Sequence, residues 1–298
     1  MEFDIPKENS SDIKVVGVGG GGSNAVNHMF NQGIQGVDFI ICNTDRQALD
    51  ISPVPYKIQL GTELTEGRGA GMKPEVGENA ALENLEDIRE LLSQNTKMLF
   101  VTAGMGGGSG TGAAGQIARL AKQQGAMTIA VVTYPFQSEG ALRKQNAEWG
   151  LERLREHCDT ILVIPNERLL EIEGVKDLPI TSAFRVGDEL LVRSITGVAE
   201  LLTIDGMVNL DFEDLRSVIN FGSGVAMIGL GSASGPGRAE AATMEALHSP
   251  LLDIDASDAR GALINVVGGA SLTLGEAEQC AKIIKDKISP HAQIIWGA

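Results

Sequence analysis

The sequence predicts an α/β protein with a large parallel-sheet domain, a long central helix and a second, smaller α/β domain. In the first half, short and almost entirely apolar runs alternate with helical patterns, as in a parallel sheet covered on both faces. Glycine-rich segments follow these runs at the carboxyl ends of strands, where ligands bind to such sheets. Residues 181–203 form one long helical pattern without proline and separate the two halves.

The individual elements follow from these patterns in chain order. Strands are predicted at 13–18, 37–43, 97–104, 127–135 and 160–166. Helices are predicted at 23–32, at 75–94, from the second glycine segment to about residue 124, and at 139–157, with a loop-rich segment at 46–74. After the central helix come helices at 212–219, 236–248 and 272–289 and strands at 224–231, 261–269 and 292–298. We therefore divide the chain into a flexible segment (1–12), a ligand-binding domain (13–180), the central helix (181–204) and a second domain (205–298).

Composition argues against several classes of protein. The 298 residues carry a net charge of −15 without any basic run, which disfavours nucleic acid as a partner. The three cysteines are far apart and the four histidines lack zinc spacing, so we expect reduced thiols and no metal site built from side chains. The polar N-terminus is no signal peptide, and no apolar run is long enough to cross a membrane. These features predict a cytoplasmic protein without direct membrane insertion.

The first glycine-rich loop covers residues 17–24 and contains a GxGxxG pattern between a strand and a helix. This is the context of a Rossmann-like dinucleotide fingerprint, with Asp38 or Asp45 as the acid further along. Alone, the pattern also fits a tight strand–helix turn.

The second loop carries six glycines within residues 104–112 and opens a helix. Glycine allows backbone N–H groups to converge on an anion, and the helix N-terminus adds partial positive charge. The hydroxyls of Ser109 and Thr111 can contribute as donors. A third loop, 67–71, is weak alone, but three such loops on one sheet edge indicate a polyphosphate held from several sides. The sequence has neither a GxxxxGK[ST] nor a GxSxG motif, so this site has no P-loop lysine and no serine nucleophile elbow.

The loops and several further motifs resemble the tubulin/FtsZ family in order and spacing, from about Ile13 to Ala298. They are GGGGSNAVNHM (19–29), CNTDRQAL (42–49), GGGSGTG (106–112), PFQSEG (135–140), IPNERLL (164–170) and NLDFEDL (209–215). The combination is specific, although each motif alone is not. The resemblance implies a GTPase that polymerises head-to-tail into filaments, as in a cell-division ring, with GTP/GDP as ligand.

The resemblance also implies roles for individual residues. The residues expected to bind the nucleotide are Gly20, Gly21, Gly22, Ser23, Asn24, Ala70, Gly71, Gly106, Gly107, Gly108, Ser109, Gly110, Thr111, Gly112, Glu139, Arg143, Asn166, Phe184 and Asp188. Among them, Ala70 and Gly71 would close over the γ-phosphate, Glu139 would accept from the ribose, and Phe184 would stack on the base. Asn166 and Asp188 would read the guanine edge, which leaves adenine unpaired. Without the family pattern, Glu139, Arg143 and Asp188 would be ordinary solvated helix residues.

The second half of the site is expected in NLDFED (209–214). By the resemblance, this loop enters the pocket of a neighbouring subunit, where Asp211 and Asp214 orient the attacking water with support from Asn209. Phosphoryl transfer needs mainly positioning and charge stabilisation, so a carboxylate that arrives only on assembly can switch hydrolysis on. Asp211 can equally serve as the N-cap of the following helix. Mg²⁺ is expected to be held mainly by the phosphates and water.

Two alternatives remain at this point. One is an NAD-type oxidoreductase built on the first loop, which leaves the second loop and NLDFED without a role. The other is a GTP-binding assembly module that does not hydrolyse GTP. The chain departs from the family at Arg68, Gly115, Ser138 and Gly187. It also stops at Ala298, where relatives continue with another strand and often a partner-binding tail, so division partners and mid-cell placement are expectations from the family alone.

Overall fold

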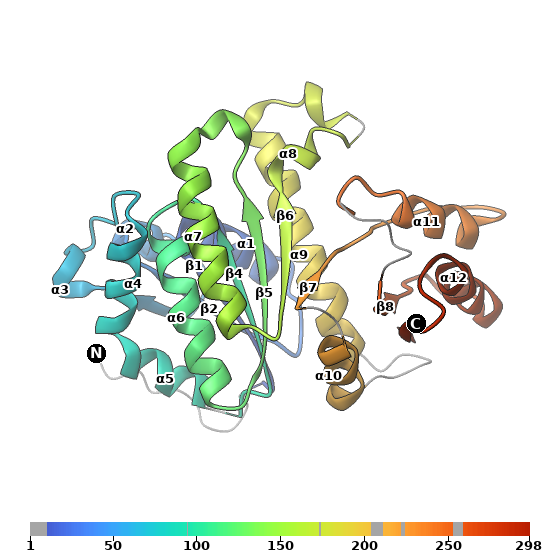
Figure 1. The fold of residues 1–298 in the computed structure, drawn as a ribbon, viewed down its shortest axis with the longest axis horizontal. Coiled ribbons are helices and arrows are strands. Elements are labelled where there is room, and N and C mark those ends of the chain that lie inside the picture. Colours follow the sequence, from blue (N-terminus) through green and yellow to red (C-terminus); the bar gives the residue numbers. More distant parts are fainter. Residues whose placement is uncertain (1–10, 94, 173, 204–210, 222–223, 253–258) are drawn as a thin grey trace.

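The computed structural model describes residues 11–93, 95–172, 174–203, 211–221, 224–252 and 259–298. Within these ranges, a large parallel sheet has helices on both faces, and a smaller parallel sheet lies beyond the long helix α9 (Ile180–Thr203) (Figure 1). The predicted class, a parallel-sheet α/β domain with a central helix and a smaller α/β domain, is confirmed.

The large sheet has the strand order β3-β2-β1-β4-β5-β6-β7, all parallel. The strands are β1 (Ile13–Val18), β2 (Asp38–Asn43), β3 (Tyr56–Gln59), β4 (Met98–Gly104), β5 (Met127–Tyr134), β6 (Thr160–Pro165) and β7 (Val225–Ala226). β1 is buried along its whole length, as its apolar sequence predicts. The chain adds strands on one side of β1 and then, from β4, on the other. A crevice at such a switch point is where open α/β sheets bind ligands.

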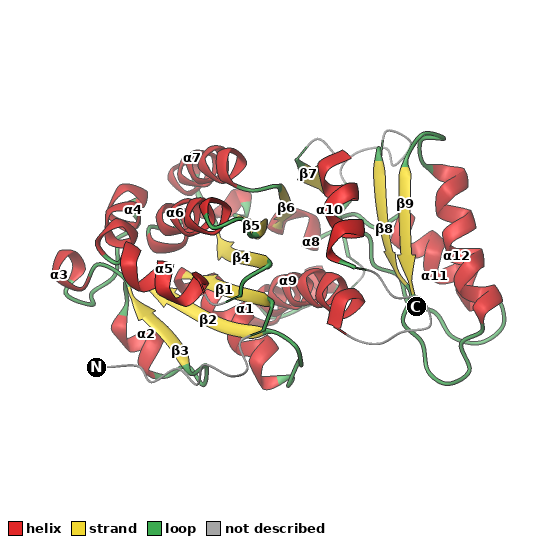
Figure 2. Ribbon diagram, turned by 90° about the horizontal axis from the view of Figure 1, so that it is seen from below, coloured by secondary structure: helices red, strands yellow, loops and turns green. Residues whose placement is uncertain are grey.

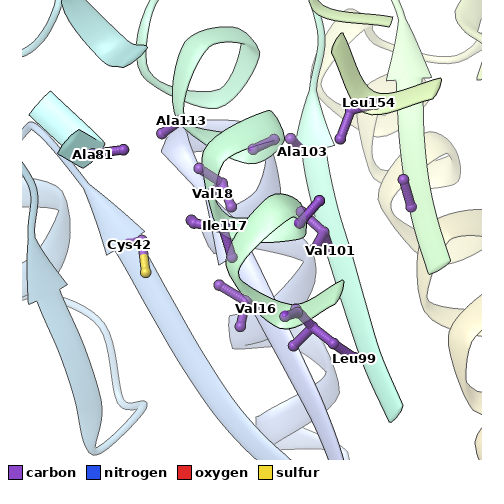
Figure 3. Close-up of a cluster of buried hydrophobic side chains, with 14 of the residues drawn as sticks. Val16, Val18, Cys42, Ala81, Leu99, Val101, Ala103, Ala113, Ile117 and Leu154 are labelled. Atoms are coloured by element: carbon purple, nitrogen blue, oxygen red, sulfur yellow. The ribbon is translucent and has the colours of Figure 1, made fainter. Parts of the chain in front are cut away.

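Two apolar layers cover the sheet. One face carries α4 (Pro74–Glu83), α5 (Leu85–Ser93), α6 (Ser109–Gln123) and α7 (Ala141–His157); the other carries α1 (Gly19–Asn31) and α9. Figure 3 shows the first layer, where Ala113 and Ile117 of α6 lie over Val16, Val18 and Val101 of the strands. Small residues on α6 let this helix pack closely on the sheet, which fixes the position of its N-terminus.

The second domain is built on two parallel strands, β8 (Gly261–Asn265) and β9 (Gln293–Gly297). Helix α10 (Phe212–Phe221) lies on one side of them, with α11 (Arg238–Leu247) and α12 (Leu274–Lys287) on the other (Figure 2). The Asn265 Nδ2 donates to the carbonyl of Gly197 in α9 at 2.9 Å, which links β8 to the central helix.

The structure differs in detail from several predictions for the first domain. Helix α1 begins at Gly19 rather than at residue 23, because glycines in its first turn pack directly against β4. The segment 46–74 is not only loop: it contains α2 (Arg46–Asp50), the edge strand β3 and α3 (Thr62–Thr65). β3 escaped notice because it is short, only one of its four side chains is buried, and proline precedes it.

The predicted helix 75–94 is two helices, α4 and α5, separated at Asn84. The Asn84 side chain accepts from the N–H of Gly61 at 2.8 Å and donates to Asp87 at 2.8 Å. The predicted helix 139–157 is likewise a 3₁₀ turn (Gln137–Glu139) followed by α7, because Gly140 has a φ of 95° that no helix contains. A further 3₁₀ turn covers Val175–Asp177.

The predicted strand 224–231 is only Val225–Ala226, and it extends the large sheet beside β6 instead of joining the second domain. The rest of the segment lies against α11. A Cβ on Gly229 would be 2.2 Å from the carbonyl oxygen of Ala246, and one on Gly231 would be 1.9 Å from that of Ala242. The glycines there allow a close backbone approach rather than strand pairing. The predicted strand 261–269 also ends early, at Asn265. Within the part of the chain that is described, no helix is long and apolar enough to span a bilayer.

Candidate active site

The N-termini of α1 and α6 meet at the switch point between β1 and β4. A Cβ on Gly19, whose φ is 68°, would lie 2.6 Å from the backbone nitrogen of Gly110, so the two first turns are in direct contact. β1 and β4 pair as far as Val18 and Ala103, which brings their carboxyl ends level. Two helix N-termini with unpaired N–H groups at one point form a strong anion site.

The glycines of this edge divide into two groups. Glycines of the first group are packed against protein: a Cβ on Gly22 would be 2.2 Å from the carbonyl oxygen of Thr102, and one on Gly112 would be 2.0 Å from that of Pro74. Glycines of the second group face open space, with no atom within 4 Å of an added Cβ; they are Gly20, Gly69, Gly71 and Gly107. The first group closes the loops onto the fold, and the second leaves backbone exposed to a ligand.

Internal hydrogen bonds hold the second loop. The N–H of Gly106 donates to the Thr111 hydroxyl at 2.9 Å, and the N–H of Gly112 donates to the carbonyl of Gly108 at 3.0 Å. Thr111 is buried. The N–H groups of Ser109 and Gly110 stand in the first turn of α6, before any helical carbonyl can accept them. Thr111 and Gly112 therefore hold the shape of the loop, whereas the N–H groups of Ser109 and Gly110 remain available to a ligand.

The third loop lies over the second. A Cβ on Gly108 would be 2.7 Å from the Ala70 Cβ, so Ala70 sits on the second loop. Buried Thr44 ties them from the β2 side: its hydroxyl is 2.5 Å from the Ser109 hydroxyl, and its carbonyl accepts from Gly69 at 3.3 Å. The resulting cradle has Gly71 at its exposed rim.

The first loop contributes exposed and buried residues. Gly20 and Asn24 are exposed, whereas Gly22 and Ser23 are buried. The Ser23 hydroxyl has no hydrogen-bond partner in the described structure. Gly20 and Asn24 are thus the parts of this loop most open to a ligand.

Residues from β5, β6 and α9 form the neighbouring part of the site. Glu139 pairs with Arg143 at 3.0 Å and accepts from the N–H of Phe136 at 2.9 Å. The ring of Phe136 packs edge-to-face on Phe184, with centroids 5.4 Å apart, and leaves Phe184 45% exposed. Phe184 thus offers a supported aromatic face at the carboxyl edge.

Asp188 lies one helical turn after Phe184 on α9, and Asn166 begins the short helix α8 (Asn166–Leu169). A Cβ on Gly187 would be 3.7 Å from the Asn166 Oδ1, which places these elements side by side. Burial raises the pKa of Asp188 to about 6, and the charge of His28 on α1 opposes this effect. A carboxyl group with little solvent is suited to accept hydrogen bonds from a ligand.

The acidic motif lies at the other end of the sheet. Asp211 accepts from the N–H of Asp214 at 2.8 Å and so caps α10, and Asp214 accepts from the N–H of Asp211 at 3.3 Å. Both are exposed. Asn209 lies outside the described residues. The Lys97 Nζ stands 5.5 Å from the centroid of Phe212 and pairs with Asp12 at 2.7 Å.

Lys97 immediately precedes β4, and the second glycine loop follows β4. The seven residues of β4 span roughly 20 Å at the usual rise per residue. The structure brings the predicted phosphate and base residues together at the carboxyl edge. Asp211 and Asp214 instead stand at the start of α10, and this helix lies beyond the amino edge, at the lower end of the sheet in Figure 1. One copy of the chain cannot join both groups.

Three contacts were not predicted from the sequence. They are the hydrogen bond between Thr44 and Ser109, the packing of Phe136 on Phe184, and the contact of Lys97 with Phe212. Thr44 and Phe136 lie inside motifs already noted, so those motifs were the available signal. Lys97 carries no motif signal. The unusual Arg68 is exposed and pairs with Glu66 at 2.8 Å.

Two observations bear on other ligands. Asp38, one candidate acid for a dinucleotide, lies at the amino end of β2 and pairs with Lys14 at 3.1 Å, away from the glycine loops. Among the described residues, no cluster of three or more His, Cys, Asp or Glu side chains could hold a metal ion. The site is therefore a backbone-lined anion cradle beside an aromatic face and a half-buried carboxyl group, which defines a nucleotide-binding α/β protein.

Comparison with known proteins agrees with this class. Residues 12–174 match the tubulin/FtsZ family GTPase domain, and residues 224–298 match the FtsZ family C-terminal domain. The chain belongs to the tubulin/FtsZ family and is a GTPase, so guanine nucleotide is its ligand. The predictions of fold, family and enzyme class are confirmed, and neither the oxidoreductase nor the non-hydrolysing module is supported.

Its relatives span most of the chain. The cell division protein FtsZ 1 of Archaeoglobus fulgidus is 51% identical over 286 residues, which are 96% of this chain and 77% of the relative. FtsZ 1 of Halobacterium salinarum is 50% identical over 294 residues, or 99% and 73% of the two chains. An empty FtsZ dimer of M. jannaschii has a TM-score of 0.92 at 45% identity, covering 98% of this chain and 84% of that one.

Proposed function

We propose that this chain hydrolyses GTP at the contact between two of its copies, in head-to-tail filaments that serve cell division. The observation that carries the proposal is the separation of the glycine cradle and the Asp211–Asp214 pair to opposite ends of one sheet. Stacking copies end to end would place the acidic end of one on the cradle of the next. The relatives named cell division proteins support the cellular role.

In the proposed site, the phosphates lie on the first turns of α1 and α6, and the exposed backbone of Gly20, Gly71 and Gly107 leaves room for them. Helix N-termini and glycine N–H groups bind phosphate without a lysine. The base lies on Phe184, with Asp188 and Asn166 toward its edge. A carboxylate there accepts from two guanine donors and has no match in adenine.

Asp211 and Asp214 of the neighbouring copy orient the attacking water. Their mutual capping bonds use one oxygen of each carboxyl group, so each keeps an oxygen for water. Phosphoryl transfer depends mainly on positioning and charge, and a carboxylate that arrives with assembly adds both. Hydrolysis then follows assembly.

Mg²⁺ fits the site only as a companion of the phosphates. Since the described part of the site offers no cluster of acidic ligands, a bound ion would take most of its ligands from phosphate oxygens and water. When bound, it would neutralise phosphate charge. We further propose that it acts in the cytoplasm at the division site; the name of its relatives, cell division protein, supports a role in division.

Assembly and phosphate release measured on the same samples test the proposal. GTP should cause pelleting, GDP should not sustain it, and phosphate release per subunit should rise with protein concentration. Activity per subunit that stays constant on dilution, while pelleting disappears, would refute hydrolysis at the contact.

A further inference from the structure

We propose that Asn146 on α7 is a positioning residue that holds the third glycine loop against the second and so favours GTP over GDP. This inference rests on the proposed function of the cradle. Asn146 lies three residues after Arg143, on the side of the cradle opposite Thr44.

The side-chain amide of Asn146 bonds to the second loop and to Met72, the residue directly after the third loop. Its Nδ2 donates to the carbonyl of Met72 at 3.0 Å and to the carbonyl of Gly106 at 3.2 Å. An amide nitrogen has two donors, so both bonds form together. Thr44 makes the corresponding link from the β2 side, through Ser109 and Gly69. The two loops are thus joined at both flanks, and α7 supplies one of the joints.

Both carbonyls belong to constrained residues. Met72 has a φ of 59°, a left-handed conformation that a residue with a side chain rarely adopts. Gly106 has a φ of 101°, and a Cβ there would be 2.9 Å from the carbonyl oxygen of Arg143. Such conformations persist where surrounding contacts enforce them, often at ligand clamps. Asn146 supplies that contact at Met72.

The position of the third loop matters for one phosphate only. Ala70 and Gly71, which belong to this loop, are the residues proposed to close over the γ-phosphate. GDP lacks that phosphate, so displacement of the third loop weakens the binding of GTP more than the binding of GDP. A general loss of structure would weaken both nucleotides alike.

The test compares Asn146→Asp, Asn146→Ala and a matched control, Gln145→Ala, on the exposed neighbouring position of the same helix. Asp has the size of Asn but turns the two donors into an oxygen facing two carbonyls, so packing stays and hydrogen bonding is lost. Dissociation constants are measured for GDP and for a GTP analogue that resists hydrolysis, in dilute protein that does not assemble. Thermal unfolding of each variant is recorded alongside.

Asn146→Ala should lower the ratio of GTP to GDP affinity by about tenfold, the loss expected for two hydrogen bonds, and Asn146→Asp should lower it further. GDP affinity and the unfolding transition should change little, and Gln145→Ala should match the parent. Equal weakening of both nucleotides, or an unchanged ratio in both variants, would overturn the inference. If the parent protein bound neither nucleotide, the proposed function would fail instead, and this inference with it.

Discussion

The two ends of the large sheet present different chemical groups. The carboxyl edge is mostly backbone: helix N-termini, glycines with open space beside them, and loops joined by Thr44 and Ala70. The amino edge presents exposed side-chain carboxylates, Asp211 and Asp214, on the first turn of α10. Backbone donors bind an anion and are hard to change one at a time, whereas a carboxylate can be removed without disturbing the fold. The comparison teaches that binding and hydrolysis should be separable by mutation.

The largest expected effect follows Asp211→Asn. Asn caps helices as well as Asp does, so α10 and the free energy of unfolding should be preserved. Loss of the carboxylate should reduce GTP turnover at least about 100-fold, in the range of a lost positioned base, while GTP binding is retained. Steady-state phosphate release and nucleotide titration measure the two properties. If Asp211→Asn kept its GTP turnover, Asp211 would serve only as the N-cap of α10 and would have no role in hydrolysis.

A pocket variant provides the second arm. Gly107→Ala adds a methyl group into open space, so the fold should tolerate it with a change in unfolding free energy below about 0.5 kcal/mol. The same methyl group would stand where a phosphate is proposed, and GTP affinity should fall at least about tenfold.

Its control is Gly112→Ala, whose added Cβ would be 2.0 Å from the Pro74 carbonyl oxygen. That change should destabilise the protein by about 1–3 kcal/mol, the usual cost of overpacking. Mixed filaments of Asp211→Asn and Gly107→Ala should recover hydrolysis, since an intact acidic end can meet an intact cradle. Co-assembly without recovery would contradict the shared site.

The sequence was sufficient for the fold class, because apolar strands and glycine-rich turns dictate a parallel sheet with its site at the switch point. It also supported the grouping of the loops, since the carboxyl ends of neighbouring parallel strands share an edge. It did not reveal β3 or the shortness of β7, because edge strands carry little apolar pattern.

Side-chain hydrogen bonds and contacts between distant segments could not be predicted from the sequence either. Asn146 and Met72 are 74 positions apart, and no local pattern marks a side chain that bonds to a remote carbonyl. The Lys97–Phe212 contact depends on how α10 meets the amino edge, which only tertiary packing decides. The roles of the individual site residues stay predictions.

The binding of GTP at the carboxyl edge should depend on pH, with an effect of intermediate size. Burial raises the pKa of Asp188 to about 6, and guanine binding needs the carboxylate, so GTP affinity should fall as pH drops below 6, by up to about tenfold per unit. Titrations of GTP at pH 5 and pH 7 measure it, and Asp188→Asn should flatten the profile.

Protonation of Asp188 has the opposite effect on folding stability, which decreases as pH rises. In the folded protein the pKa of Asp188 lies above the ordinary value for an aspartate, so the unfolded chain releases this proton first as pH rises. The Asp188 contribution should therefore decrease between about pH 4 and pH 6 and stay level above. A GTP affinity that is weaker at pH 7 than at pH 5 would remove Asp188 from the guanine edge.

The smallest effect should follow Lys97→Met, which keeps the apolar stem and removes the charge near Phe212 and Asp12. An exposed cation–π contact contributes roughly 0.5–1 kcal/mol, so the correct placement of α10 should become about two to five times less populated. Turnover in filaments should fall by that factor, while GTP affinity in dilute protein stays constant because the cradle lies at the far edge. Lys97→Arg, which keeps the charge, should restore the rate. A change in GTP affinity without a change in turnover would show that the two edges are not independent, and the separation between binding and hydrolysing ends would fail.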